Sequence, residues 1–338
     1  MRQAQPAPQA ETPPPRHPAL LSVVVPCYNE SDGLRALLAA LTPVLEPLAP
    51  RHEIILVDDG SRDNTFDIAR ELSRSDPRVK ALRFARNFGK EAAMAAGLAH
   101  AAGDAVVLMD ADLQHPPAVI PEMLKAWAAG ADMVIAVRRR RDTDSWLRRL
   151  VSRAFYHLFD AVSEVRIPPG AGDFRLFDRK VVQAIVSLPE RNRFMKGITS
   201  WVGFRQECLP FDVADRASGR SSWNLLKLVR YAWDGITSFS TLPLRVWSVL
   251  GMAIAGLSAL YGLWLVISTT VFGIDVPGYA SLMVSTLFLG GVQLISLGVL
   301  GEYVGRIFLE VKMRPMYLVA DSAGFDEAEP SGSGRKRR

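Results

Sequence analysis

Two aspartates one residue apart, Asp110 and Asp112, stand directly after a short apolar run, Ala105 to Met109. In an extended segment, residues two apart point to the same side, so both carboxylates can face one ligand. Mg²⁺ and Mn²⁺ prefer carboxylate oxygens and usually share their coordination shell with substrate phosphates. Such a metal would neutralise a departing diphosphate, which is the electrostatic requirement of sugar transfer from a nucleotide sugar. A pair of solvated turn aspartates is the alternative interpretation.

These carboxylates must be positioned by regular structure, and the N-terminal part of the chain alternates short apolar runs with helix-like segments. The segments include Gly33 to Leu48 and Glu91 to Ala102. This alternation predicts an α/β domain with a mostly parallel sheet and helices on both faces. We expect five buried strands, at Leu21 to Val25, Glu53 to Val57, Val79 to Phe84, Ala105 to Met109 and Met133 to Val137.

Polar residues follow four of these expected strands. They are Tyr28-Asn29-Glu30, Asp58-Asp59, Asp110-Ala111-Asp112 and Arg138. Ligands in open α/β sheets bind at the carboxyl ends of the strands, so we expect these side chains to surround one ligand. For Tyr28 and Glu30 the alternative is an ordinary turn and helix cap.

The chain resembles the family 2 glycosyltransferases in five motifs: VVVPCYNE (Val23 to Glu30), DDGS (Asp58 to Ser61), RNFGKEAA (Arg86 to Ala93), DADLQHPP (Asp110 to Pro117) and GDFRLFDR (Gly172 to Arg179). Within that family it resembles the polyprenyl-phosphate glycosyltransferases, relatives of dolichol-phosphate mannose synthase, and above all the bacterial undecaprenyl-phosphate glucosyltransferase type. The resemblance implies a GT-A (Rossmann-like) fold. It also implies inverting transfer of a hexose, with UDP-glucose favoured as donor, to undecaprenyl phosphate.

The resemblance further implies a set of donor-binding residues and a divalent metal, Mg²⁺ or Mn²⁺. Asp110 and Asp112 match the metal and diphosphate positions, and Asp58 matches the carboxylate near the base. The implied donor-binding set is Pro26, Tyr28, Glu30, Asp58, Asp110, Ala111, Gln114 and Arg216.

An arginine-rich stretch follows the fifth expected strand. An acceptor phosphate is already ionised, so it needs cations that hold it in line with the anomeric carbon more than it needs a strong base. In the family pattern, Arg138 and Arg153 fall near the acceptor-phosphate contacts. A solvated, membrane-facing basic surface is the alternative, above all for Arg139 and Arg140.

Asp173 completes the expected catalytic set with Asp112 and Arg138. By resemblance it lies near the donor sugar and the acceptor. A carboxylate inside an arginine-rich site should have a lowered pKa and stay ionised, so we expect it to orient the phosphate or the sugar hydroxyls instead of acting as a general base. A structural ion pair with Arg175 or another arginine is the alternative.

A later segment, Asp215 to Asn224, resembles a loop that closes over the donor and excludes water. Arg216 and three later positions fit the family pattern Arg-x-x-Gly-x-Ser-Lys-aromatic. Ser222 stands where that pattern has lysine, which removes one expected diphosphate contact.

Two uncharged apolar runs, Val246 to Phe272 and Tyr279 to Leu300, are each long enough to cross a membrane, for which a helix needs about 20 residues. The loop between them lacks Lys and Arg, whereas both outer flanks are basic, so we expect both termini in the cytoplasm. Ser145 to Ala161 and Trp223 to Phe239 mix aromatic, apolar and basic residues and predict interfacial helices. The alternatives are a buried hairpin for the spans and core packing for the interfacial helices.

The expected organisation is a disordered lead (1–19), a catalytic domain (20–215), a donor loop with an interfacial helix (216–243), a transmembrane hairpin (244–306) and a cytoplasmic tail (307–338). The tail is polar from Asp321 and is expected to be disordered. We expect a multi-pass protein of the bacterial inner membrane, with a nucleotide sugar, a polyprenyl phosphate and the membrane as partners. By resemblance, a homo-oligomer and a flippase are further expected partners.

Composition removes several other classes. The chain has 338 residues, of which 49% are hydrophobic and 22% charged, which excludes a disordered protein. Two cysteines without CxxC spacing argue against a disulfide framework and a cysteine zinc site. A net charge of +5 does not indicate nucleic-acid binding, and we expect none; it fits an anionic membrane surface or phosphate-bearing ligands.

Three other functions are less consistent with the motifs. A processive polysaccharide synthase should carry Gln-x-x-Arg-Trp and more spans. A sugar nucleotidyltransferase should carry a glycine-rich phosphate loop, where this chain reads PCYNE. A catalytically silent membrane scaffold would not need the two aspartates of Asp110-Ala111-Asp112 or Asp173.

Overall fold

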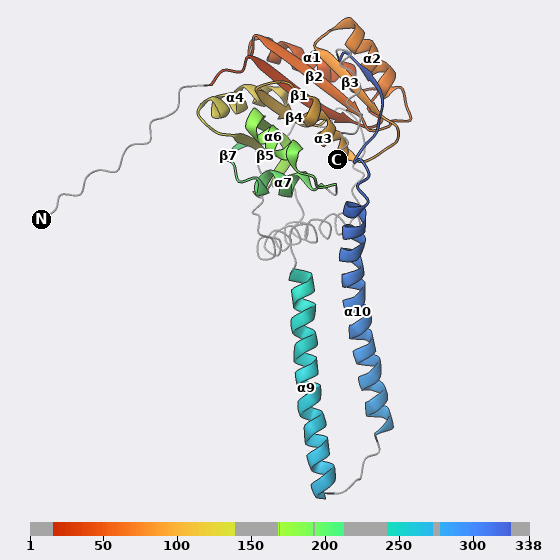
Figure 1. Cartoon of the computed structure of the whole chain (residues 1–338). Helices are drawn as coiled ribbons and strands as arrows, with labels where there is room; N and C mark the ends of the chain where they lie inside the picture. The colour runs from red at the N-terminus through yellow and green to blue at the C-terminus, as the bar shows by residue number, and fades with distance from the viewer. Residues whose placement is uncertain are drawn as a thin grey trace, which may run out of the picture. The chain divides into compact units, whose positions relative to one another are not determined.

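The computed structural model describes residues 16–138, 168, 170–191, 193–212, 242–272 and 278–325. The chain divides into two compact units (Figure 1). The described part of the first unit comprises the residues up to 212 together with 315–325. The described part of the second comprises 242–272 and 278–314.

The first unit is built on one eight-stranded sheet with the order β7-β5-β6-β4-β1-β2-β3-β8. Its strands are β1 (Leu20–Cys27), β2 (Arg51–Asp58), β3 (Val79–Phe84), β4 (Ala105–Leu108), β5 (Met133–Arg138), β6 (Ala171–Asp178), β7 (Gln206–Phe211) and β8 (Val319–Ala323). Within this sheet β6 and β8 run against the other six strands. The predicted mostly parallel α/β sheet is therefore confirmed, as are all five predicted strands.

Helices cover both faces of the sheet. Successive side chains of β1 point to opposite faces, and apolar residues on both faces pack against helices. Val23 and Val25 belong to the core cluster that includes the leucines of α1 (Leu34–Leu45). Val24 points the other way, where Gly97 of α3 (Lys90–His100) packs against it. The other helices in the described part of this unit are α2 (Thr65–Ser75), η1 (Pro117–Val119), α4 (Ile120–Ala128), α6 (Arg179–Ser187) and α7 (Met195–Trp201).

Strand β8 comes after the second unit in sequence but extends the sheet of the first. It pairs antiparallel with β3, and the ring of Tyr317 stacks on Phe84 with centroids 4.9 Å apart. Arg70 of α2 forms an ion pair with Asp321. The prediction that the polar tail is disordered from Asp321 is therefore wrong for residues 321–325. The prediction from composition failed because so short an edge strand is held by backbone pairing and a few side-chain contacts, and it carries no apolar pattern.

The N-terminal lead is also ordered earlier than predicted. Arg16 Nη1 lies 2.9 Å from Asp178 Oδ2, and the Ala19 N–H donates to Asp104 Oδ2 at 2.8 Å. The predicted disorder is thus wrong for residues 16–19, because carboxylates elsewhere in the fold supply partners that local composition does not reveal. Residues 1–15 lie outside the described part of the chain.

The second unit contains two long helices, α9 (Leu242–Phe272) and α10 (Tyr279–Val311). Among the described residues, one stretch, Phe288–Val311, is both long and apolar enough to cross a membrane, with a mean hydropathy of 1.4. This stretch overlaps the second predicted span but ends later. The predicted interfacial segments, 145–161 and 223–239, lie outside the described residues.

The contact between α3 and β1 gives a stability prediction. A Cβ at Gly97 would stand 2.1 Å from Val24 Cγ1, so Gly97→Ala should destabilise the protein by about 1–3 kcal/mol. The cost of this overlap exceeds the gain in helix propensity, which favours alanine over glycine by about 1 kcal/mol. Thermal unfolding of the full chain in detergent should show a Tm lowered by several degrees.

Gly256→Ala in α9 is the matched control, because a Cβ there meets no atom within 4 Å. An unchanged Tm for Gly97→Ala, with Gly256→Ala also unchanged, would contradict the tight packing of α3 on β1.

Candidate active site

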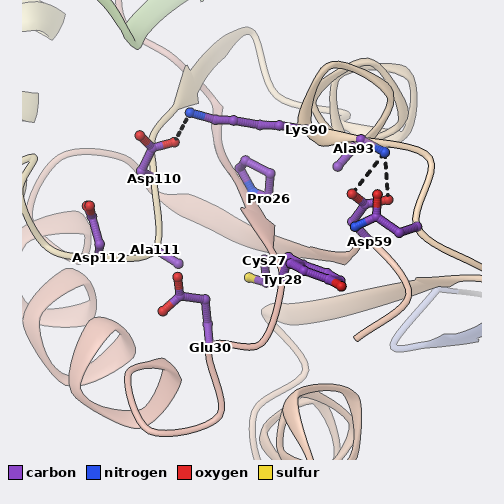
Figure 2. A pocket seen from close by; sticks show the side chains of 12 residues that line it. Pro26, Cys27, Tyr28, Glu30, Asp59, Lys90, Ala93, Asp110, Ala111 and Asp112 are labelled. Carbon is purple, nitrogen blue, oxygen red and sulfur yellow. Dashed lines mark hydrogen bonds and ion pairs between the residues drawn. The ribbon is translucent and has the colours of Figure 1, made fainter. Parts of the chain in front are cut away.

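The loops that leave β1, β2 and β4 enclose a cavity of about 370 Å³ together with the start of α3 (Figure 2). Most of the predicted donor-binding residues line this cavity, and Tyr28 is 42% exposed. The lining residues are Pro26, Cys27, Tyr28, Glu30, Asp59, Asn87, Gly89, Lys90, Ala93, Asp110, Ala111 and Asp112.

The second aspartate of the DDGS motif lines the cavity, while the first is buried beside it. Asp59 accepts the N–H groups of Phe88 and Gly89 at 2.7 and 3.0 Å. Asp58 is 1% exposed and accepts the Ser61 N–H. Burial raises the pKa of Asp58, and Arg83 Nε lies 3.8 Å from its Oδ2. The family resemblance matched Asp58, with Asp59 beside it, to the carboxylate near the base, and Asp59 is the one of the two that lines the cavity.

The loop after β1 is fastened to the loop after β2 by several hydrogen bonds. The Asn29 N–H donates to Ser61 Oγ at 2.9 Å, and Asn29 Oδ1 accepts the Arg62 N–H at 3.0 Å. The Glu30 N–H donates to Thr65 Oγ1 at 2.9 Å. These bonds hold the backbone of the loop that carries Tyr28 and Glu30 at the cavity wall.

The segment Asp110-Ala111-Asp112 is held by its own neighbours. The Asp110 N–H donates to His115 Nδ1 at 3.2 Å, and Asp112 Oδ1 accepts the Gln114 N–H at 3.1 Å. His115 is 2% exposed and stacks on Phe174 with centroids 5.0 Å apart. Leu113 has a φ of 56°, an uncommon conformation for a bulky residue that accompanies functional sites.

Three carboxylates, those of Glu30, Asp110 and Asp112, line the same cavity. Burial raises the pKa of Glu30, and the negative charges of Asp112 and Asp110 add to this shift. Burial also raises the pKa of the Cys27 thiol well above its ordinary value, reinforced by Asp58 and other carboxylates. The thiol therefore stays protonated and is unsuited to be a nucleophile. The negative charges, in contrast, favour a bound cation.

The aspartates fit a divalent metal whose coordination shell is completed by a ligand. Among the described residues, no three His, Cys, Asp or Glu side chains form a complete metal cluster. Asp110 and Asp112 both line the cavity and offer carboxylate oxygens. Mg²⁺ and Mn²⁺ sites of this kind use one or two carboxylates plus phosphate oxygens and water.

Lys90 connects the two acidic motifs of the site. Its ammonium lies 2.6 Å from Asp110 Oδ1 and 2.6 Å from Asp173 Oδ2, and Figure 2 shows the contact with Asp110. Both carboxylates raise the pKa of Lys90 against the opposing effect of burial, so the ammonium stays charged. Asp173, at the start of β6, is thereby brought to the side of the cavity that holds Asp110.

Asp173 is surrounded by positive charge, as predicted, but its main partners are lysines. Burial alone would raise the pKa of Asp173. The charges of Lys90 and Lys196, together with Arg175, hold it well below its ordinary value. The carboxylate is therefore ionised near neutral pH, which agrees with an orienting role and not with a general base.

The predicted acceptor arginines are only partly described. Arg138 is exposed at the end of β5, and its Nη2 donates to Gln114 Oε1 at 3.4 Å. Two predicted site residues, Arg138 and Gln114, are thus in contact with each other. Arg153, Arg216 and the predicted donor loop, 215–224, lie outside the described residues.

Sequence reasoning gave no role to Lys90, and none to His115, and it placed Asp59 only beside Asp58. A signal for Lys90 was present, since it follows Gly89 at the start of a predicted helix within the RNFGKEAA motif. His115 lies inside DADLQHPP, where its small distance from Asp110 in sequence could have indicated a hydrogen bond to that loop.

Comparison with known proteins agrees with this geometry. Residues 22–186 match glycosyl transferase family 2, and residues 242–307 match the GtrB C-terminal hairpin. A glycosyltransferase from Synechocystis is 51% identical over 306 residues, which cover 90% of this chain and 96% of the relative. The chain therefore belongs to family 2 of the glycosyltransferases and is an enzyme of that class.

Other relatives carry more specific names. A prophage-derived bactoprenol glucosyl transferase from Shigella flexneri is 50% identical, with 89% of this chain and 98% of the relative covered. A prophage bactoprenol glucosyl transferase homolog from Escherichia coli is 46% identical, with 88% and 98% covered. Among solved structures, glucosyl-3-phosphoglycerate synthase from Mycobacterium tuberculosis is 20% identical at a TM-score of 0.46, with 65% of this chain and 78% of that chain covered.

Glu91, next to Lys90, gives a prediction of pH-dependent stability. Its Oε2 accepts the Met195 N–H at 2.9 Å, and burial, reinforced by Asp173, raises the pKa of Glu91 to about 7. The folded state thus holds a proton that the unfolded state releases near pH 4.5. This contribution to stability is full below about pH 4.5 and is lost as the pH rises through 7.

Glu91→Gln should remove this dependence, because the amide oxygen can still accept the Met195 N–H. At pH 8 the variant should unfold at a higher temperature than the wild type. Its free energy of unfolding should be larger by about 1.4 kcal/mol for each unit of the pKa shift. At pH 5 the two should differ little. Glu122→Gln, at an exposed position in α4, is the control and should show the same difference from wild type at both pH values. A pH-independent difference for Glu91→Gln would contradict the raised pKa.

Proposed function

We propose that this enzyme transfers glucose from UDP-glucose to a polyprenyl phosphate, with inversion at the anomeric carbon, and that the product is a polyprenyl-phosphate sugar for glycan or lipid modification. The names of the relatives support the sugar and the bactoprenol carrier, because they are about 50% identical over nearly the whole chain. The single observation that carries the chemistry is the cavity lined by Asp110, Asp112 and Lys90, whose ammonium also lies 2.6 Å from Asp173 Oδ2.

The donor would lie with its nucleoside in the half of the cavity lined by residues from β1 and β2. The exposed ring of Tyr28 offers a stacking surface for a base, and Asp59 and Glu30 offer acceptors for base and ribose hydroxyls. Pro26 and Ala111 add apolar walls. Asp58 supports this wall from behind through Ser61, and Arg216 would contact the donor from the closing loop.

The diphosphate would lie against Asp110 and Asp112. A divalent metal held by these two carboxylates supplies charge that stabilises the departing diphosphate. Mg²⁺ and Mn²⁺ both suit these ligands. The backbone N–H of Gln114 donates to Asp112, and its side chain would add a polar contact on the same side.

The acceptor phosphate would enter from the side of Asp173 and Arg138. Arg138 and Arg153 would bind and orient the phosphate oxygens, and an ionised Asp173 would position the sugar or the acceptor through hydrogen bonds. Because the attacking oxygen is already negatively charged, the chain needs to supply orientation and charge balance more than proton removal.

The membrane-spanning part of the proposal adds α9 to the span in α10. The match of residues 242–307 to the GtrB C-terminal hairpin supports two spans, as does the uncharged run from Val246 to Phe272. The basic outer flanks favour a multi-pass protein of the bacterial inner membrane, with both termini and the catalytic domain in the cytoplasm. The boundaries 20–215, 216–243 and 244–306 remain predictions, as do a homo-oligomer and a flippase partner.

An assay with purified full-length protein tests the proposal. With undecaprenyl phosphate, Mg²⁺ or Mn²⁺ and UDP-glucose, we expect a lipid-linked glucose detectable by mass spectrometry. UDP-galactose, UDP-N-acetylglucosamine and GDP-mannose should give less product. Failure to form a lipid-linked product from any of these donors would sink the proposed reaction.

Asp112→Asn should lower the transfer rate by about 100-fold or more, because it removes charge where the diphosphate departs. The fold should survive, since the amide oxygen can still accept the Gln114 N–H. Asp67→Asn, at an exposed position in α2, is the matched control and should keep wild-type activity. Comparable rates for Asp112→Asn and Asp67→Asn would remove Asp112 from the catalytic set.

A further inference from the structure

The ammonium of Lys90 is shared between two carboxylates that come from different strands. Asp110 follows β4 and Asp173 lies in β6, and each has an oxygen 2.6 Å from Lys90 Nζ. The side chain of Lys90 is 43% exposed, against 27% for Asp110 and 20% for Asp173. Lys90 therefore has the most exposed side chain of the three.

The backbone at this lysine is fixed, whereas its side chain is partly exposed. Lys90 is the first residue of α3, and it follows Gly89, whose φ of 98° suits glycine. The Gly89 N–H donates to both oxygens of Asp59. The backbone is thus held in place, and movement of the ammonium has to come from rotation along its four-carbon side chain.

A metal at Asp110 and Asp112 would compete with this ammonium. Both cations would approach the same carboxylate. The repulsion energy of like charges a few ångström apart is on the order of a few kcal/mol even near a protein surface. Asp173 offers Lys90 an alternative partner that it already contacts. The ammonium can therefore release Asp110 without losing its own charge compensation.

We propose that Lys90 is a placeholder cation, which occupies the Asp110 carboxylate in the free enzyme and withdraws to Asp173 when a metal–diphosphate group arrives. This inference rests on the metal site of the proposed function. In the free enzyme the lysine keeps the aspartate oriented and limits its occupation by metal alone. After displacement the same ammonium reinforces Asp173 at the side where the acceptor would enter.

Binding of Mn²⁺ to the full-length protein in detergent, without donor or lipid, tests the placeholder. The unbound Mn²⁺ is measured by its electron paramagnetic resonance signal, so the readout does not depend on turnover. Removal of a competing, partly exposed ion pair should tighten binding, and Lys90→Met should bind Mn²⁺ about two- to fivefold more tightly than the wild type. Lys90→Arg keeps the cation and should stay within about twofold of the wild type.

Lys196→Met is the matched control, because Lys196 also acts on Asp173 and its removal changes the net charge of the same cluster equally. We expect a smaller change in Mn²⁺ affinity than for Lys90→Met. Lys180→Met, which removes a lysine 2.8 Å from Asp132, should leave the affinity unchanged. Thermal unfolding checks that each variant is folded, and Lys90→Gln provides a second uncharged variant if Lys90→Met does not fold.

Unchanged or weaker Mn²⁺ binding by Lys90→Met and Lys90→Gln would overturn the placeholder, as would equal tightening by Lys196→Met, because net charge alone would then explain it. Absence of Mn²⁺ binding to the wild type and to Lys90→Met alike would overturn the placeholder together with the metal site. If Lys90→Met tightens binding while no lipid-linked sugar forms, the placeholder stands and the proposed transfer fails, so the two failures are distinguishable.

Discussion

The parallel pairing of β1 with both β2 and β4 is the constraint on which the site depends. Cys27 lies opposite Asp58 in this register, and Val24 lies opposite Leu108, so three strands leave the sheet at the same edge. Their following residues have to meet there, whatever the details of the loops. Hydrogen bonds such as that from the Asp59 N–H to the Cys27 carbonyl, at 2.9 Å, then fix the loops to each other. An apolar core thus determines where the polar chemistry collects.

Collection of so many carboxylates at one edge has an electrostatic cost, and the fold offsets it in several ways. Asp59 is satisfied by backbone N–H groups, while Asp58 relies on Ser61 and the more distant Arg83. Asp110 and Asp173 rely on Lys90. Among the described residues Glu30 has no such ion pair, and burial together with the charges of Asp112 and Asp110 raises its pKa. The negative potential that remains at the cavity floor is what a metal–diphosphate ligand would use, since a buried charge without a partner is costly.

Sequence patterns predicted the parts of this structure that depend on local periodicity. The five predicted strands formed because each carries mostly buried side chains, and several of the polar residues after them line the cavity because strand ends converge. What could not be predicted depends on contacts between distant segments. The register that turns Asp59, and not Asp58, toward the cavity is set by β1, and the partner of Asp173 comes from α3, 83 residues earlier in the chain. Strands β6 to β8 were missed because they are antiparallel, short or at the sheet edge.

Strand β8 also has a consequence for how the protein can be made. The strand that covers β3 is synthesised after both helices of the second unit. Until then β3 presents unpaired backbone groups, which is a template for pairing with other chains. A nascent chain therefore has to complete α9 and α10 before its catalytic sheet is sealed. A fragment that stops before the helices would leave that edge of the sheet open to such pairing.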